Sequence, residues 1–268
     1  ASIRTNNAEG RVSQWNDLSG NGNHAFQTNT VSKQPLYQED GPGGLPTLFF
    51  PESSRAGLTT ETSLTSAYSV FIVTRVLDLG ELGITWRRLL PSRDANWFLG
   101  TYTPGTFCAF MGTTYLTGPK TFLRSSYRFN RTYTLSAVNT AASQRFYVNG
   151  FDLSVNTAAK TAPGRLAIGG AGASGDPSDA QISEVIAYNR ALSEEERQQV
   201  ETYLAGRYGV TTEGFLGSVW KSSVRSGLWS DSANWEQALP AAPMLGFNAT
   251  LPTVSTNDLT GLTLDGVM

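Results

Sequence analysis

Apolar residues recur along the chain in short runs that are rich in β-branched and aromatic side chains and separated by turn-forming residues. This pattern predicts strands rather than helices. The expected strands are residues 45–50, 68–76, 88–90, 97–102, 106–111, 133–138, 145–148, 165–169 and 181–188. Residues 1–44 are polar and rich in turns. Asn149-Gly150 predicts a hairpin after residues 145–148, because this pair tolerates the positive φ angles of a type I′ turn.

One segment has the period of an α-helix. Ser193 and Glu196 have the spacing of a capping box, and Gly209 suits the position just after the last turn. The apolar face of this helix consists of Val200, Tyr203, Leu204 and Tyr208. We expect the helix to pack on one edge or mouth of the β-structure.

These elements predict an all-β fold over residues 1–210, an antiparallel β-sandwich of the jelly-roll type with one short C-terminal helix. The pattern changes after Val210. Residues 211–268 read as a linker followed by a small β-rich segment, in which Trp229 and Trp235 precede prolines and alternating Thr, Leu and Val. We interpret this segment as stacked β-coils that form the beginning of a longer β-rich repeat segment.

Composition and charge narrow the function classes. A chain of 268 residues is long enough for one large sandwich and a smaller unit. Its net charge of −2 gives no field that favours nucleic acid or an anionic membrane, and we find no apolar stretch of the ~18 residues that a spanning helix requires. The single cysteine, Cys108, excludes an internal disulfide, and its apolar neighbours predict a buried thiol.

Three motifs resemble the bacterial laminin-G-like and concanavalin-A-like lectin–glucanase jelly-roll domains. They are residues 12–25, residues 146–150, and residues 182–193 with the capped helix that follows. Residues 217–243 resemble the β repeats of autotransporter-like surface proteins. Together these resemblances imply an extracellular or cell-surface protein. The family has an apolar strand just before the position of Ala1, so we expect that the chain is cropped or that a neighbouring copy supplies this strand.

Oxygen-bearing side chains alternate in one turn-rich segment. Asp17, Ser19, Asn21 and Asn23 surround a glycine at the sixth position, which is the spacing of a calcium loop. Thr28 stands where a bidentate Glu would complete such a loop. Ca²⁺ is therefore one interpretation, and a turn whose side chains cap their own backbone is the other. Asp176 and Asp179 are a second place where oxygens could converge, with a solvated loop as the alternative.

Aromatic and polar side chains gather around the turn at residues 91–96. Sugar binding needs aromatic faces for C–H surfaces and amides, carboxylates or Arg for hydroxyls. The candidate carbohydrate-binding residues are Trp86, Arg88, Asp94, Asn96, Trp97 and Tyr102. The alternative is that these aromatic residues pack in the core or at its rim.

Catalytic motifs are weak in this sequence. His24 is the only histidine, and we find no pair of carboxylates on one strand face, so a triad or a glycosidase acid pair is not expected. The favoured hypothesis is a non-catalytic, extracellular carbohydrate-binding or adhesion module of a large bacterial protein, with a glycan as partner. The alternative is a structural subunit that contacts neighbouring copies or domains. A glycoside hydrolase or lyase is a third hypothesis.

Overall fold

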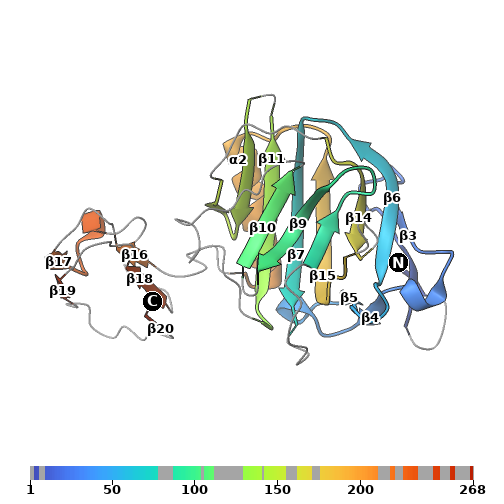
Figure 1. Cartoon of the computed structure of the whole chain (residues 1–268), viewed down its shortest axis with the longest axis horizontal. Coiled ribbons are helices and arrows are strands. Elements are labelled where there is room, and N and C mark those ends of the chain that lie inside the picture. The colour runs from blue at the N-terminus through green and yellow to red at the C-terminus, as the bar shows by residue number, and fades with distance from the viewer. Residues whose placement is uncertain are drawn as a thin grey trace.

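The computed structural model shows strands in two stacked layers, with a helix against one of them (Figure 1). The structure describes residues 3–5, 10–77, 87–103, 106–111, 129–140, 142–154, 162–170, 176–210, 218–220, 226–234, 244–247, 254–256 and 266–267.

One layer is an antiparallel seven-stranded sheet in the order β13-β12-β11-β7-β15-β5-β4. Its strands are β4 (Leu36–Gln38), β5 (Thr47–Phe50), β7 (Tyr68–Val76), β11 (Thr132–Asn139), β12 (Gln144–Val148), β13 (Phe151–Asp152) and β15 (Ala180–Tyr188). Strand β7 was expected as a largely buried strand rich in β-branched residues, and it lies at the centre of this sheet beside β15. A strand in that position has neighbours on both edges and a layer on each face, which explains its composition.

The other layer consists of two antiparallel sheets, β1-β2-β3-β6-β14 and β10-β9-β8. Their strands are β1 (Ile3–Thr5), β2 (Val12–Trp15), β3 (Ala25–Phe26), β6 (Gly57–Leu64), β14 (Gly164–Gly169), β8 (Arg87–Pro91), β9 (Trp97–Thr103) and β10 (Thr106–Met111). A bridge between Ser92 and Leu166 joins the two sheets. The Arg93 amide also donates to the Arg165 carbonyl at 2.8 Å. This seam brings the turn after β8 beside β14.

The core lies between the layers and is filled by inward-facing side chains of both. Its largest fully buried members include Trp97, Tyr68, Tyr133, Phe50 and Phe107. The Trp97 Nε1–H donates to the Tyr68 hydroxyl at 2.8 Å, so the polar end of each ring is satisfied inside an apolar core. The predicted all-β sandwich is therefore confirmed.

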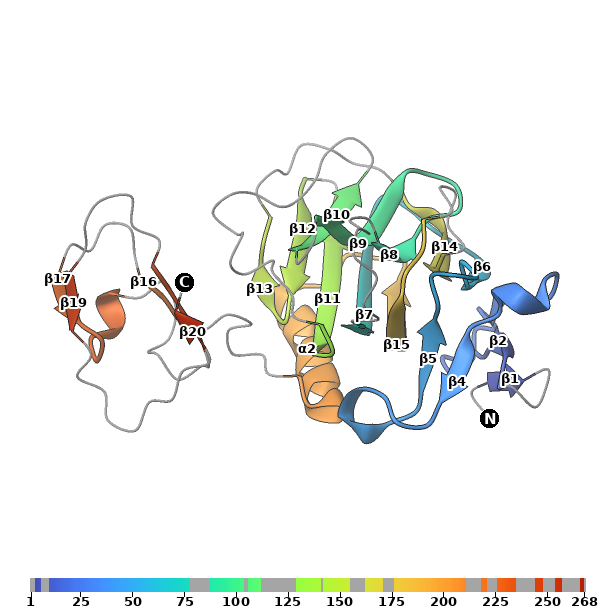
Figure 2. The same ribbon diagram turned by 60° about the horizontal axis from the view of Figure 1, so that its bottom comes forward.

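Helix α2 (Glu194–Tyr208) has the expected caps. Ser193 and Glu196 form a capping box, and Gly209 has a left-handed backbone with φ of 64°. The expected position on an edge or mouth is wrong, because the helix covers the outer face of the seven-stranded sheet (Figure 2). Leu204 and Tyr208 pack there on a second apolar cluster, whose sheet residues include Phe71 and Val73.

The helix face also differs from the expected one. Tyr203 is half exposed, whereas Arg197 and Glu201 are buried. The reason is polar chemistry on the sheet, because the Ser136 hydroxyl of β11 donates to Glu201 at 2.6 Å. A hydrophobic count along the helix could not identify these two residues as part of the packed face.

Several strands were not expected from the sequence. Strands β2, β3 and β4 are short, and β6 contains five Thr, Ser or Glu residues between its buried ends, Leu58 and Leu64. The Asn149-Gly150 hairpin is confirmed, with φ of 50° and 86° at the two positions and β13 paired to β12.

The C-terminal strands pair only in parallel among the described residues. Strands β16 (Ser218–Trp220), β18 (Met244–Phe247) and β20 (Gly266–Val267) form one sheet, and β17 (Ser226–Leu228) and β19 (Val254–Thr256) form another. Parallel pairing of every second short strand is the arrangement that stacked coils produce. The division into residues 1–210 and 211–268 stays a prediction. No helix in the described part of the chain combines the length and apolar character that crossing a bilayer requires.

Candidate functional site

The structure describes the side chains of four of the six predicted carbohydrate-binding residues, and these fall into two groups. Arg88, Asp94 and Asn96 lie near one another on β8 and the turn between β8 and β9. Trp97 begins β9 but points into the core. Trp86 lies outside the described residues, as does the side chain of Tyr102.

The assignment of Trp97 to a ligand surface is wrong. Its side chain is 0% exposed and packs edge-on against Tyr68, with ring centroids 5.7 Å apart. A ring between two sheets has no face to offer a sugar. The alternative interpretation, core packing, is the one that the structure supports for this residue.

Arg88 is buried, and both Nε and Nη2 of its guanidinium have hydrogen-bond acceptors. Its guanidinium donates to Asp176 at 2.7 Å and to the Asn96 amide oxygen at 3.0 Å, and it lies 4.3 Å from the centroid of the Phe98 ring. This arrangement links Asp176 to the β8–β9 turn. Arg88 and Asn96 therefore build the turn and have little freedom to bind a ligand.

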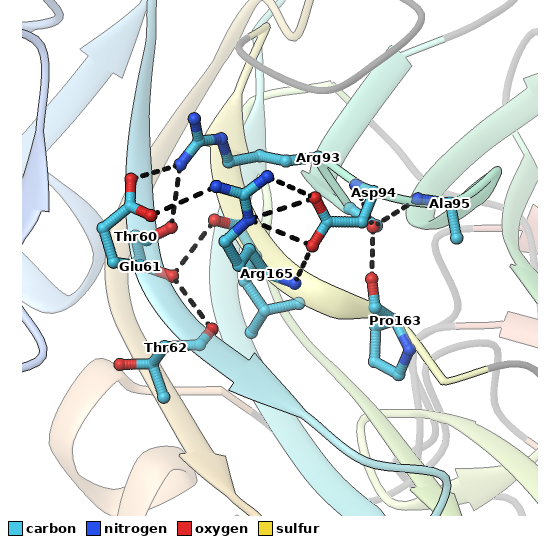
Figure 3. A network of polar contacts seen from close by, with 10 residues as sticks. Thr60, Glu61, Thr62, Arg93, Asp94, Ala95, Pro163 and Arg165 are labelled. Carbon is cyan, nitrogen blue, oxygen red and sulfur yellow. Dashed lines mark hydrogen bonds and ion pairs between the residues drawn. The ribbon is translucent and has the colours of Figure 1, made fainter.

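Asp94 extends from the turn toward β14, where it binds Arg165 (Figure 3). The Arg165 guanidinium donates from Nη2 to Asp94 Oδ1 at 2.6 Å and from Nε to both carboxylate oxygens, and its backbone amide donates to Oδ2 at 2.7 Å. Gly164 makes room for this contact, since a Cβ there would lie 2.7 Å from Asp94 Oδ2.

Glu61 of β6 binds both Arg165, the partner of Asp94, and a second arginine, Arg93. It accepts from Arg165 Nη1 at 3.1 Å and from Arg93 Nη1 at 2.6 Å (Figure 3). We call Glu61, Arg93, Asp94 and Arg165 the Glu61 network. Neither Glu61 nor Arg165 was a sequence candidate, because β6 was not expected as a strand and the two residues are 104 positions apart.

The network fixes the charge state of its two acids. Hydrogen bonds from Arg165 lower the pKa of Asp94 to about 2, and hydrogen bonds from Arg93 and Arg165 lower the pKa of Glu61. The pKa of Arg165 is raised by its bonds to Asp94 and Glu61. Both carboxylates are thus ionised at neutral pH and neither is a proton donor there.

The network lies on the accessible outer face of the molecule. The Glu61 side chain is 70% exposed, and the other three members are between 27% and 38% exposed. The outer face of the opposite sheet is covered by α2 and by the 3-10 turn Pro42–Gly44, where a Cβ on Gly43 would lie 2.9 Å from the Tyr208 Cα. A ligand has better access to the face with the Glu61 network.

The loop with calcium-like spacing is a self-capped turn. Asp17 Oδ1 accepts from the Ser19 amide at 2.8 Å, and Oδ2 accepts from the Ser19 hydroxyl at 2.8 Å and the Asn23 amide at 2.9 Å. Asn21 donates its side-chain amide to the Ser19 hydroxyl at 3.0 Å. Both Asp17 oxygens thus face hydrogen-bond donors, so this donor set does not fit Ca²⁺ as it stands.

The second candidate metal position also lacks convergent oxygens. Asp176 binds Arg88, and Asp179 forms an ion pair with Arg87 at 3.6 Å. Within the described ranges, no three His, Cys, Asp or Glu side chains gather in a way that could hold a metal ion.

Cys108 is buried, as its apolar neighbours predicted, and burial raises the pKa of its thiol.

Comparisons with known proteins support the fold. No family model matches the chain, and no curated protein matches it. The binding domain of Paraclostridial Mosquitocidal Protein 1 is 14% identical, with a TM-score of 0.53 over 76% of this chain and 52% of that chain. The botulinum neurotoxin serotype G binding domain is 9% identical, with a TM-score of 0.50 over 70% and 48%.

A mutant of Trypanosoma rangeli sialidase displaying trans-sialidase activity is also similar. It is 17% identical, with a TM-score of 0.51 over 78% of this chain and 33% of that chain. The chain thus spans about a third of the sialidase structures that it matches. At these identities, the likeness to all three proteins shows a shared all-β fold and nothing finer.

Proposed function

We propose that this protein is a non-catalytic, extracellular carbohydrate-binding or adhesion module that holds a glycan at the Glu61 network. One observation carries the proposal: two carboxylates and two guanidinium groups from three elements are held in fixed geometry on the accessible outer face. Carboxylates accept from sugar hydroxyls and guanidinium groups donate to them, and prior fixation reduces the entropy lost on binding.

The charge state of the network supports binding without catalysis. A glycosidase of the usual kind needs one carboxylic acid with a raised pKa to protonate the leaving group. Glu61 and Asp94 have lowered pKa values, so both stay ionised. Glu201, whose pKa burial raises, is a residue of α2 and is buried against the outer face of the seven-stranded sheet, on the other side of the sandwich.

The setting of the module is part of the proposal. The motifs at residues 12–25, 146–150 and 182–193 favour a laminin-G-like jelly roll at a bacterial surface. Two of the structures that share the fold are named as binding domains, one of a mosquitocidal protein and one of a botulinum neurotoxin, which is compatible with a binding role. Parallel pairing among β16–β20 supports the stacked β repeats that accompany such a location.

The test is a glycan array with the full chain, followed by calorimetric titration of the best glycan. Replacing Glu61 and Arg165 together by alanine is expected to weaken binding at least tenfold, because hydrogen bonds to charged groups are lost. The matched control is Arg145→Ala, which removes an exposed ion pair with Asp152 on β12–β13. Equal loss in both variants, or unchanged affinity in the double variant, would contradict the proposal.

A second candidate function is a structural subunit of an extracellular assembly. The observation that favours it is β1 (Ile3–Thr5), a largely exposed strand with one strand neighbour, β2, in the described part of the chain. Such an edge offers backbone groups to a strand of a neighbouring copy. Light scattering after size-exclusion chromatography tests this function, and a strict monomer at high concentration would count against it.

A further inference from the structure

We propose that the Glu61 network binds acidic glycans, and that the Nε and Nη2 edge of the Arg93 guanidinium receives the carboxylate of the sugar acid. This inference rests on the proposed function and specifies its ligand. The Arg93 side chain donates from Nη1 to Glu61 at 2.6 Å and to the Thr60 carbonyl at 3.1 Å. Its Nε and Nη2 have no acceptor among the described residues, so two parallel N–H groups are left for a ligand.

Arg165 shows how such an edge is used in this molecule. Its Nη1 donates to Glu61 at 3.1 Å, while Nη2 donates to Asp94 Oδ1 at 2.6 Å and Nε to Oδ2 at 3.1 Å. One guanidinium thus holds two carboxylates, one at Nη1 and one across the Nε and Nη2 edge. Arg93 also has Glu61 at Nη1 but lacks the second carboxylate. A ligand carboxylate on Arg93 completes the same arrangement, which is the strongest mode of carboxylate binding by arginine.

The open edge of Arg93 is accessible and held in place. The side chain is 27% exposed, and neither Nε nor Nη2 is among the described polar atoms that are buried without a partner. The dashed lines that reach the Arg93 guanidinium end at a single nitrogen, which leaves the other two open (Figure 3). The backbone amide of Arg93 is fixed by its 2.8 Å bond to the Arg165 carbonyl. A group fixed in advance loses less entropy when a ligand binds.

The distribution of charge in the network favours an anion at Arg93. The two oxygens of Glu61 are shared between the two arginines, and the Asp94 carboxylate forms its ion pair with Arg165. Arg165 therefore contacts two carboxylates and Arg93 contacts one. On the equivalent edge of Arg165, hydrogen bonds lower the pKa of Asp94 to about 2, although Glu61 is bound to the same guanidinium. A second carboxylate on one arginine is thus stable in its ionised form.

Glu61 makes the site suited to a sugar acid rather than to a simple carboxylate. Each of its oxygens accepts one bond from an arginine, so lone pairs remain, and its side chain is 70% exposed. A sugar acid has a carboxylate and hydroxyl groups on one ring. It can bind Arg93 with the carboxylate and donate a hydroxyl to Glu61, because the two groups are adjacent at 2.6 Å. An acidic peptide side chain has no such hydroxyl and uses Arg93 alone.

The experiment compares sugar acids with their methyl esters on the full chain. An array of uronic-acid oligosaccharides carries each compound beside its ester, which keeps the ring and the hydroxyls and loses the charge. Calorimetry at low and high salt then measures the pair that binds best. We expect the acid to bind at least tenfold more tightly than the ester, and salt to weaken the acid. Equal or tighter binding of the ester would overturn the inference while leaving the binding function intact.

A variant makes the test sharper. Arg93→Lys keeps the positive charge beside Glu61 but replaces two parallel N–H groups by one ammonium. The preference for the acid over the ester is expected to fall about tenfold, with an unchanged thermal midpoint as the folding control. The matched control is Arg145→Lys, at the exposed ion pair with Asp152, which should keep the preference.

Two outcomes of the variant experiment separate the inference from the proposed function. An unaltered preference in Arg93→Lys, or an equal loss in Arg145→Lys, would overturn the inference. Absence of binding to every glycan, neutral or acidic, would instead overturn the proposed function, and the inference with it.

Discussion

The guanidinium group of Arg197 lies 3.9 Å from the centroid of the Tyr147 ring, so a charged side chain of α2 packs over an aromatic ring of β12. Arg197 also forms an ion pair with Glu201, and both side chains are at most 5% exposed. The helix is thus attached to the sheet by polar contacts as well as by the apolar cluster around Leu204.

Removing the carboxylate of Glu201 should destabilise the protein. Glu201→Ala removes one of the two carboxylates that pair with the buried Arg197 and leaves Glu194 as the other, and we expect a loss of about 1–3 kcal/mol in the free energy of unfolding. Arg197→Met combined with Glu201→Leu removes both charges and should cost much less. Urea denaturation measures both. A double variant as unstable as the single one would show that the charges themselves are required.

Trp97 should behave as a core residue. Trp97→Ala removes a fully buried ring and its bond to Tyr68, so we expect a loss of about 3–5 kcal/mol in unfolding free energy. The matched control is Tyr203→Ala on the half-exposed face of α2, which should change stability little. A soluble, fully stable Trp97→Ala protein would contradict the position of this side chain.

Acid should weaken the Glu61 network in a defined pH window. The pKa of Asp94 is about 2 in the folded protein, below its unfolded value of about 3.9. Its contribution to stability is therefore complete above about pH 4 and is lost as the pH falls toward 2. Asp94→Asn should lose less stability than the wild type between pH 4 and 2. Identical declines in urea denaturation would contradict the lowered pKa.

Calcium should have no effect through the loop of Asp17. Both of its carboxylate oxygens accept hydrogen bonds from Ser19 and Asn23, and these bonds lower the pKa of Asp17 although burial opposes them. Adding millimolar Ca²⁺ or a chelator is expected to leave the thermal midpoint unchanged. A rise with Ca²⁺ that Asp17→Asn abolishes would show that the loop rearranges to bind the ion.

The sequence by itself determined nine strands of the sandwich, the hairpin and helix α2, because these depend on local chemistry. The nine-residue run at residues 68–76 became β7, Asn149-Gly150 became a hairpin, and the capping box at Ser193 began α2. Each of these signals is carried by residues that are neighbours in the chain. A local pattern suffices to specify them.

The tertiary structure decided which face each element buries and which distant side chains meet. Trp97 and Asp94 are three positions apart, yet one is in the core and the other on the surface, because the strand begins between them. Glu61 and Arg165 meet only because β6 and β14 pair. Such contacts join segments with no sequence relationship, and strand pairing across a sandwich is fixed by the packing of the whole.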